Sequence, residues 1–439
     1  MQLINHEVIK MSGKLSCTNL LKIVQSAFSN ITESAARQRS FSLKDCLLSA
    51  YAMFSLKYPS LLQFDQHFRE EMIEHNLHHI YGIESVPSDT RMRERLDPLP
   101  AKELRKPFKR LFAECQRSKR LDLFRFYDDR YLLPLDGTGY FYSKEVHCDN
   151  CCQKNHRDGT TSYYHQMLSG AIVHPDQKVV LPFPPEAIVK TDGKTKNDCE
   201  RRAAERFLDD LKREHPHLKL IITGDGLFSN GPYIKRLKAD DHRFILVAKE
   251  GDHKALFEEF HSLPKQKHDY QRDGITHRFE FINGLAINDS HLDCLVNVLE
   301  YWEEHPNGKV QHWVWVTDFQ LTEKNVYQIM KGGRARHKIE NETFNTLKNH
   351  GYQFEHNFGH GKQNLSTVFA HLMMLAFFVD QLQQLGCPLF TKALARLHSK
   401  KSLWERMRSA FTMLFIDSLE DLWLALAHGH RTKLVPDTS

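Results

Sequence analysis

Three acidic residues stand where carboxylates often take part in chemistry. Asp136 follows the apolar run YLLPL at residues 131–135, and Asp225 follows LKLIITG at residues 218–224. Apolar, β-branched runs bounded by turn residues predict buried strands, and α/β sheets place ligand chemistry at the carboxyl ends of such strands. A third acid, Glu340, lies in a charged segment with helical spacing. An Asp-Gly pair by itself more often only shapes a turn, so the prediction depends on whether the three carboxylates meet.

Carboxylates in this pattern suit the metal-dependent cleavage and transfer of phosphodiesters. Mg²⁺ prefers oxygen ligands, binds through few carboxylates and keeps several water molecules. Two such ions, about 3.5–4 Å apart, can activate the attacking oxygen and stabilise the leaving one. We therefore predict a Mg²⁺ site, in which Mn²⁺ could substitute. Asp136 would bridge two ions, and Asp225 and Glu340 would complete one ligand shell each.

The segment around Glu340 also offers a phosphate ligand. Arg336 lies four residues before Glu340, so the two share one face of a predicted helix. A guanidinium beside a metal-binding carboxylate can hold a phosphate through two hydrogen bonds. A surface salt bridge is the simpler alternative. Glu342 is the alternative to Glu340 as the third metal ligand.

Three short motifs, in this order, resemble the DDE transposases of bacterial insertion sequences. The likeness is to the group whose glutamate lies on a tyrosine–arginine–glutamate–lysine helix. The motifs are LDGTG at 135–139, ITGDGLF at 222–228 and RHKIENETFNTLK at 336–348. The resemblance spans about residues 130–380. It implies an RNase H-like catalytic core, a β-rich insertion before the glutamate helix, cleavage at transposon ends and strand transfer into a target.

The sequence departs from this group at two positions. The tyrosine of the group would fall at position 333, which is Gly here. The lysine is expected seven residues after the glutamate, whereas Lys348 lies eight residues after Glu340. Arg336 keeps the spacing of the group only if Glu340 is the metal ligand, and we therefore choose Glu340.

The predicted fold is α/β: an RNase H-like mixed sheet with flanking helices, interrupted by a β-rich insertion and preceded by an all-helical domain. Strand and helix patterns alternate after about residue 130, and helical spacing dominates both ends of the chain. The expected regions are a helical DNA-binding region at 1–125, the first part of the catalytic core at 126–249, the insertion at 250–321, the core with the glutamate helix at 322–380 and a C-terminal helical region at 381–439.

Residues 102–125 form a basic amphipathic stretch with nine Lys or Arg and three acidic residues. A solvated helix face is the simpler interpretation. Together with the resemblance, the stretch predicts binding to double-stranded DNA, at transposon ends and target, through phosphates. The candidate DNA-binding residues here and further along the chain are Arg105, Lys109, Arg336, Lys348, His360 and Lys362. For His360 and Lys362, which are flanked by glycines, a plain loop is the alternative.

Cys148 and Cys151 have the spacing of a zinc-ligand pair. His156 and His165 follow, and Cys199 could supply a ligand from the next helix, but the sequence does not define the second half of a site. A structural zinc ion and ordinary thiols are the two alternatives. The nine cysteines are an odd number in a chain without an evident secretory signal, which indicates reduced thiols.

Composition places the chain among globular proteins, with 41% apolar and 26% charged residues. The net charge of +5 permits a polyanionic partner but does not require one. The most apolar run, residues 368–379, is too short to span a bilayer, so we expect no membrane partner. The expected location is the bacterial cytosol, in association with the nucleoid. The resemblance implies a homodimer on paired DNA ends.

Three functions are consistent with these patterns. The first is a DDE transposase. The second is an RNase H-like DNA nuclease that cleaves without strand transfer. The third is a transposase-derived DNA-binding protein that no longer performs catalysis.

Overall fold

The protein, in a computed structural model that describes residues 13–31, 41–193 and 196–429, divides into two units. The helical unit comprises Met1–Asp122, Gly139–Gln166 and Asn345–Ser439, and the sheet unit comprises Leu123–Thr138 and Met167–Phe344. The ends of the expected terminal regions, residues 1–12 and 430–439, lie outside the described residues. Each unit is therefore assembled from segments that are distant in the sequence.

The helical unit is built mainly from helices that begin at well-formed caps. Ser16, Ser42, Ser60 and Ser418 each accept a backbone N–H from the first turn of the helix that follows, as helix N-caps commonly do. Its elements are α1 (Cys17–Ser29), α2 (Leu43–Ser55), α3 (Leu61–His67), α4 (Glu71–Tyr81), α5 (Asp89–Leu96), α6 (Arg105–Arg117), β3 (Cys152–Asn155), α11 (Asn345–Asn349), α12 (Leu365–Gly386), α13 (Pro388–Leu397), α14 (Lys400–Met413) and α15 (Leu419–His428).

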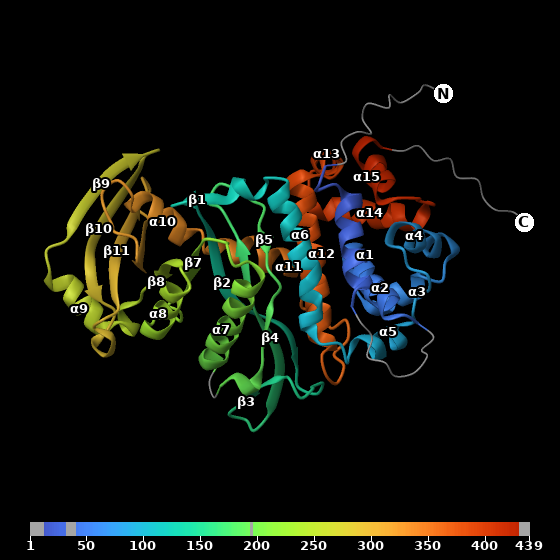
Figure 1. Ribbon diagram of the computed structural model, residues 1–439, viewed down its shortest axis with the longest axis horizontal. Helices are drawn as coiled ribbons and strands as arrows, with labels where there is room; N and C mark the ends of the chain where they lie inside the picture. Colours follow the sequence, from blue (N-terminus) through green and yellow to red (C-terminus); the bar gives the residue numbers. More distant parts are fainter. Residues whose placement is uncertain (1–12, 32–40, 194–195, 430–439) are drawn as a thin grey trace, which may run out of the picture. The chain divides into compact units, whose positions relative to one another are not determined.

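Helix α12 forms the centre of the helical unit. It packs against α2 and α6, and α1 also contacts it (Figure 1). By length and composition α12 could cross a membrane, but 94% of its most apolar 18-residue window is buried inside the protein. Such burial is typical of the core helix of a soluble protein.

The N-terminal helices share this core rather than forming a domain of their own. Lys57, which follows α2, donates a hydrogen bond of 2.7 Å to Asp380 of α12, and both side chains are buried. Removing one partner of a buried ion pair costs about 3–5 kcal/mol. The boundary expected near residue 125 therefore marks a change of unit, but residues 1–122 cannot be removed without exposing α12.

The sheet unit contains a mixed sheet with helices. Strands β2 (Arg130–Ser143) and β4 (Thr161–Ile172) begin in one unit and end in the other. The other elements of the sheet unit are β1 (Arg125–Tyr127), β5 (Leu181–Pro182), β6 (Glu186–Ile188), α7 (Lys196–Glu214), β7 (Leu220–Gly224), α8 (Gly231–Ala239), β8 (Arg243–Val247), α9 (Lys254–Ser262), β9 (Gln266–Arg272), β10 (Ile275–Ala286), β11 (Leu295–Glu304), β12 (Val310–Thr317) and α10 (Val326–Arg334).

The strand order in this unit is β4-β2-β7-β8-β12-β11-β10-β9. All five residues of β7 are buried, and β7 pairs in parallel with β2 on one side and β8 on the other. A continuous apolar run is typical of a strand covered on both faces. The α/β class with a mixed sheet is thus present.

The region expected as a β-rich insertion, residues 250–321, extends this same sheet. Strand β12 pairs antiparallel with β8, and β11, β10 and β9 follow in order (Figure 1). The β-rich character expected for this region is present, although α9 also lies in it. The attachment of these strands to the edge at β8 is a tertiary contact that no local pattern predicts.

Gly332 and Gly333 lie in the last turn of α10. A Cβ atom on Gly332 would come within 2.8 Å of Ile245, and one on Gly333 within 2.5 Å of the Trp315 indole. The two glycines therefore allow α10 to lie close against β8 and β12. A tyrosine at position 333 would collide with Trp315.

Candidate functional site

Strand register brings two of the predicted carboxylates together in the sheet unit. In the parallel pair β2–β7, Leu132 is opposite Ile221 and Pro134 is opposite Thr223. Two residues further along each chain stand Asp136 and Asp225. Residues two apart on a strand project to the same face, so this register directs both carboxylates to one side. We expected strand β2 to end at Asp136, but it continues to Ser143.

Each aspartate is oriented by its own backbone. Oδ1 of Asp136 accepts the N–H of Gly137 at 3.0 Å, and Oδ1 of Asp225 accepts the N–H of Leu227 at 3.0 Å. Such local hydrogen bonds are common for Asp at turns. In Asp136 the second oxygen, Oδ2, accepts a hydrogen bond of 3.2 Å from Nη2 of Arg336. Arg336 thus contacts Asp136, but it does so from the turn after α10, whereas Glu340 lies in a π-helical segment, so the single helix predicted to carry both residues is not present.

Glu340 lies in a π-helical segment, Ile339–Phe344, and its side chain is exposed. Burial raises the pKa of Asp136; the Arg336 guanidinium lowers it, while the charges of Asp225 and Glu340 raise it further, and the net shift is upward. Both other carboxylates therefore act on Asp136. Glu342 acts instead on Lys338, whose pKa burial lowers and the charge of Glu342 raises. The charge effect of Glu340 on Asp136 favours Glu340 as the third member of this group.

The three carboxylates form an open group rather than a closed cage. Among the described residues, the clusters whose ligand atoms all lie within 4.8 Å of one another do not include Asp136, Asp225 and Glu340. A wider spread suits ligands that would share two ions about 3.5–4 Å apart. The crowded negative charge around Asp136 is the feature of this group that favours a cation.

A hollow beside Asp225 adds a residue that the sequence patterns missed. Its volume is about 630 Å³, and Glu200, Lys249 and His253 are among its lining residues. The carboxylate of Glu200, on α7, lies 3.0 Å from the place where a Cβ atom on Gly137 would stand. Glu200 is buried. No sequence pattern marks Glu200 as part of a site, because it is one of several charged residues on α7.

The π-helical segment explains the irregular spacing of the third motif. A π-helical turn holds one residue more than an α-helical turn, and such turns are frequent at functional sites. The eight residues between Glu340 and Lys348 therefore correspond to seven in an uninterrupted α-helix. Lys348 itself forms an ion pair of 2.8 Å with Glu355 in the helical unit.

Other predicted DNA-binding residues have different outcomes. Arg105 is buried in the helical unit, with 6% of its surface exposed, so the prediction that it contacts DNA is wrong for this structure. The apolar face of α6 that carries it turns into the core. Lys109, four residues later, is exposed, as are its basic neighbours Lys102, Lys106, Arg110, Arg117, Lys119 and Arg120.

The loop with His360 and Lys362 is held internally. The Asp97 carboxylate accepts the backbone N–H groups of residues 362 to 365, including Lys362, at 3.0–3.1 Å. Although burial raises the pKa of Asp97, these four N–H groups outweigh it and hold the pKa below its ordinary value. An internal carboxylate thus takes the hydrogen bonds that a phosphate would use. The Lys362 side chain is exposed, but His360 is buried and does not face a phosphate backbone.

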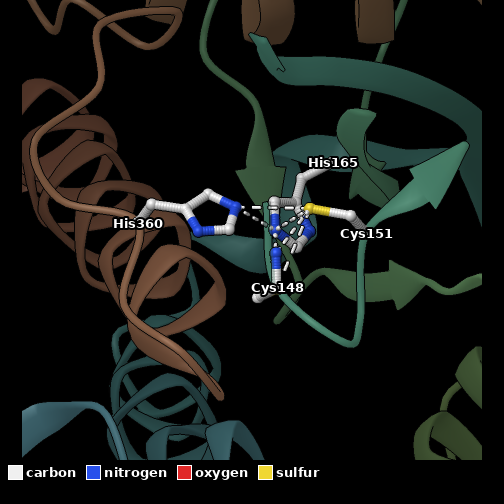
Figure 2. A group of neighbouring side chains, drawn as sticks. All are labelled: Cys148, Cys151, His165 and His360. Carbon is white, nitrogen blue, oxygen red and sulfur yellow. Dashed lines mark hydrogen bonds between the residues drawn. The ribbon is translucent and has the colours of Figure 1, made fainter. Parts of the chain in front are cut away.

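His360 belongs instead to a cluster with Cys148, Cys151 and His165 (Figure 2). All four residues lie in the helical unit. The CxxC pair is the one that the sequence marked as candidate zinc ligands, and the tertiary structure places the two histidines beside it. The other suggested ligands lie elsewhere: Cys199 contacts the carbonyl oxygen of Gly193, and His156 bonds Ser162.

No protein-family model matches the chain, and no curated protein sequence matches it. Function is therefore inferred from the residues and their geometry.

Proposed function

We propose that this protein is a DDE-type DNA transposase that cleaves phosphodiesters at the ends of an insertion sequence and joins them to target DNA. One observation carries the proposal: Asp136 on β2 and Asp225 directly after β7 each lie two residues beyond the paired Pro134 and Thr223 of these parallel strands, and Glu340 acts on the same carboxylate that Arg336 contacts. These are the three acids and the arginine of the motifs at 135–139, 222–228 and 336–348.

The strand order of the sheet unit supports an RNase H-like core. The part of the sheet from β5 to β8 has the order β5-β4-β2-β7-β8. Strand β4 is antiparallel to both β5 and β2, and β7 runs parallel to both β2 and β8. Helix α7 precedes β7, and α8 connects β7 to β8. Three antiparallel strands followed by two parallel ones is the arrangement proposed from the sequence.

The residues present fit a divalent cation. Asp136, Asp225 and Glu340 would hold Mg²⁺, or Mn²⁺ in its place, because their crowded charges repel one another and their oxygens are ligands that such ions prefer. When bound, the metal would activate the attacking oxygen and stabilise the leaving one. Arg336 is placed to orient the phosphate. Its Nη2 bonds Asp136, and its buried Nε has no hydrogen-bond partner among the described residues.

The exposed basic face of α6 is the proposed contact for double-stranded DNA. It carries Lys109 with Lys102, Lys106, Arg110 and Arg117 around it. Lys106 also forms an ion pair with Glu103, which precedes α6, and Arg117 forms one with Glu114 on the helix. The resemblance further implies a homodimer on paired ends and a place in the bacterial cytosol with the nucleoid, and the size of the protein–DNA complex tests the first of these.

The test uses the full-length protein, DNA carrying the ends of its element, a target plasmid and Mg²⁺. We expect products in which the ends are joined to the target. Cleaved ends without joining would instead identify an RNase H-like nuclease, and a stable uncut complex would identify a non-catalytic DNA-binding protein. Either outcome contradicts the proposal.

Asp225→Asn separates chemistry from binding in the same assay. Asparagine keeps the shape and the turn but removes the charge that holds a cation, so cleavage should be lost while end binding is retained. Asp252→Asn is the matched control, because Asp252 lines the same hollow as Asp225 and is exposed. Normal cleavage by Asp225→Asn would rule out the carboxylate site.

A further inference from the structure

We propose that Cys148, Cys151, His165 and His360 bind one zinc ion in a closed, four-coordinate structural site. The site lies entirely in the helical unit and does not depend on the proposed function. Figure 2 shows the four side chains directed toward a common centre. The two cysteines come from the loop before β3, His165 comes from β4, and His360 comes from the loop before α12.

The distances between donor atoms are those of a tetrahedron around zinc. With Zn–S of about 2.3 Å and Zn–N of about 2.0–2.1 Å, a tetrahedral ion sets its ligands about 3.8 Å (S to S), about 3.5 Å (S to N) and about 3.3 Å (N to N) apart. The two sulfur atoms are 3.8 Å apart. The sulfur atoms of Cys148 and Cys151 lie 3.5 and 3.4 Å from Nε2 of His165, and the Cys151 sulfur lies 3.3 Å from Nε2 of His360. The two Nε2 atoms are 3.1 Å apart.

This geometry differs from that of the alternatives for a pair of thiols. A disulfide has sulfur atoms about 2.0 Å apart, whereas these are 3.8 Å apart. Hydrogen bonds alone would not require all four donors to converge, because each needs only one partner. Four soft or borderline donors around one centre select zinc over Mg²⁺ and Ca²⁺, which prefer oxygen.

Contacts around the cluster also suit metal ligands. Nδ1 of His360 lies 3.0 Å from the carbonyl oxygen of Gly361, which favours the tautomer with its proton on Nδ1 and leaves Nε2 free. The backbone N–H of Cys148 donates to the Cys151 sulfur at 3.4 Å. His165 and His360 are buried. With four protein ligands there is no open position for a substrate, so the role is structural rather than catalytic.

The ion would join segments that are far apart in the sequence. His165 and His360 are separated by 195 residues. The same loops meet at a second point, where Asn150 donates a hydrogen bond of 2.9 Å to the carbonyl oxygen of Gln363. Gly361, with a φ of +68°, allows the chain to pass Asp97, since a Cβ atom there would lie 2.3 Å from Oδ1. Zinc would thus fix the loop before α12 to the β3–β4 hairpin.

The experiment measures zinc in the full-length protein, purified without a metal-affinity step, by elemental mass spectrometry. We expect about one zinc ion per chain, and loss of that ion in Cys151→Ser and His360→Ala. Two controls should keep it: Cys152→Ser, which changes the adjacent buried thiol, and His75→Ala, which removes the only other His-containing candidate group among the described residues, His75 with His79 and Asp417.

Cobalt provides a second readout if a cysteine variant fails to fold. Co²⁺ in place of zinc in the unaltered protein should give the intense visible bands of tetrahedral coordination with thiolate charge transfer, and added zinc should abolish them. Protein that holds no zinc and gives no such spectrum would overturn the proposal, as would equal zinc content in Cys151→Ser. Neither result decides the proposed transposase function, because that function is tested by measuring DNA products.

Discussion

The carboxylate site of the sheet unit and the cysteine–histidine cluster of the helical unit are built from opposite kinds of donors. The carboxylates of Asp225 and Glu340 act on Asp136 through their charges, but the three form no group of ligand atoms within 4.8 Å among the described residues; a hollow adjoins Asp225, and Glu340 is exposed. In the cluster, two sulfur and two nitrogen atoms converge at 3.1–3.8 Å, and most of their side chains are buried.

We interpret this difference as one between a proposed site for chemistry and a proposed site for stability. An open group of carboxylates would leave room around a cation for water and phosphate oxygens, which a phosphoryl-transfer site needs. A zinc ion enclosed by four protein ligands would leave no such room and would only hold the chain together. Without a cation, the charges of Asp225 and Glu340 disfavour the ionised form of Asp136.

The largest expected effect is on cleavage. Glu340→Gln should lower the rate of end cleavage by at least about 10³-fold, roughly 4 kcal/mol in the barrier, because a metal ligand is lost. Glu342→Gln, two residues away, should cleave at a near-normal rate. The measurement is a single-turnover assay with both variants. If Glu342→Gln loses cleavage and Glu340→Gln does not, the third ligand has been misassigned.

The next effect is on stability and should appear in the helical unit. Cys148→Ser with Cys151→Ser should lower the free energy of unfolding by about 2–4 kcal/mol, by analogy with the loss of a covalent cross-link of similar span. Denaturant titration measures it, with Cys152→Ser as the control. Magnesium removal should not reproduce this loss. An equal loss on removing magnesium would mean that the open site is structural as well.

The third effect is a gain in stability at the open site. Burial raises the pKa of Asp136 above its ordinary value of 3.8, and although Arg336 opposes the shift, Asp225 and Glu340 add to it. The folded state then holds this proton more tightly than the unfolded state, so stability falls as the pH rises from about 4 through the raised pKa. Asp136→Asn removes that cost and should raise the melting temperature at pH 7.

Thermal unfolding at several pH values, in magnesium-free buffer with zinc retained, checks this expectation. The advantage of Asp136→Asn should shrink as the pH approaches 4, where the carboxyl is protonated in both states. Magnesium should raise the melting temperature of the unaltered protein but not that of the variant. A lower melting temperature for Asp136→Asn at pH 7 would show that Asp136 stabilises the fold.

The smallest effect concerns DNA binding by α6. Lys109→Glu should weaken end binding at all salt concentrations and reduce the slope of log affinity against log salt by about 1, because one phosphate contact is lost. Lys219→Glu, an equally exposed lysine in the sheet unit, is the control. Fluorescence anisotropy from low to high salt measures both. Equal slopes for the two variants would exclude α6 as a phosphate contact.

Much of the secondary structure was readable from residue patterns. The apolar runs before Asp136 and Asp225 became the parallel strands β2 and β7, and the run at 368–379 became part of buried α12. The CxxC pair was visible as half of a metal-ligand set. These features depend on spacing within about twenty residues, where side-chain periodicity and backbone preference act directly.

The sequence by itself therefore determined the strands that lead to the two aspartates and the buried central helix, and it marked the cysteine pair without deciding between a zinc ligand and ordinary thiols. Only the tertiary structure decided that His165 and His360 lie against that pair, that Arg105 is buried while Lys109 is not, and that β12 joins the sheet at β8. It also decided that Glu340 lies in a π-helical segment and that its charge acts on Asp136. These outcomes depend on which faces of distant segments pack together, and the free energy of such packing is not encoded in local periodicity.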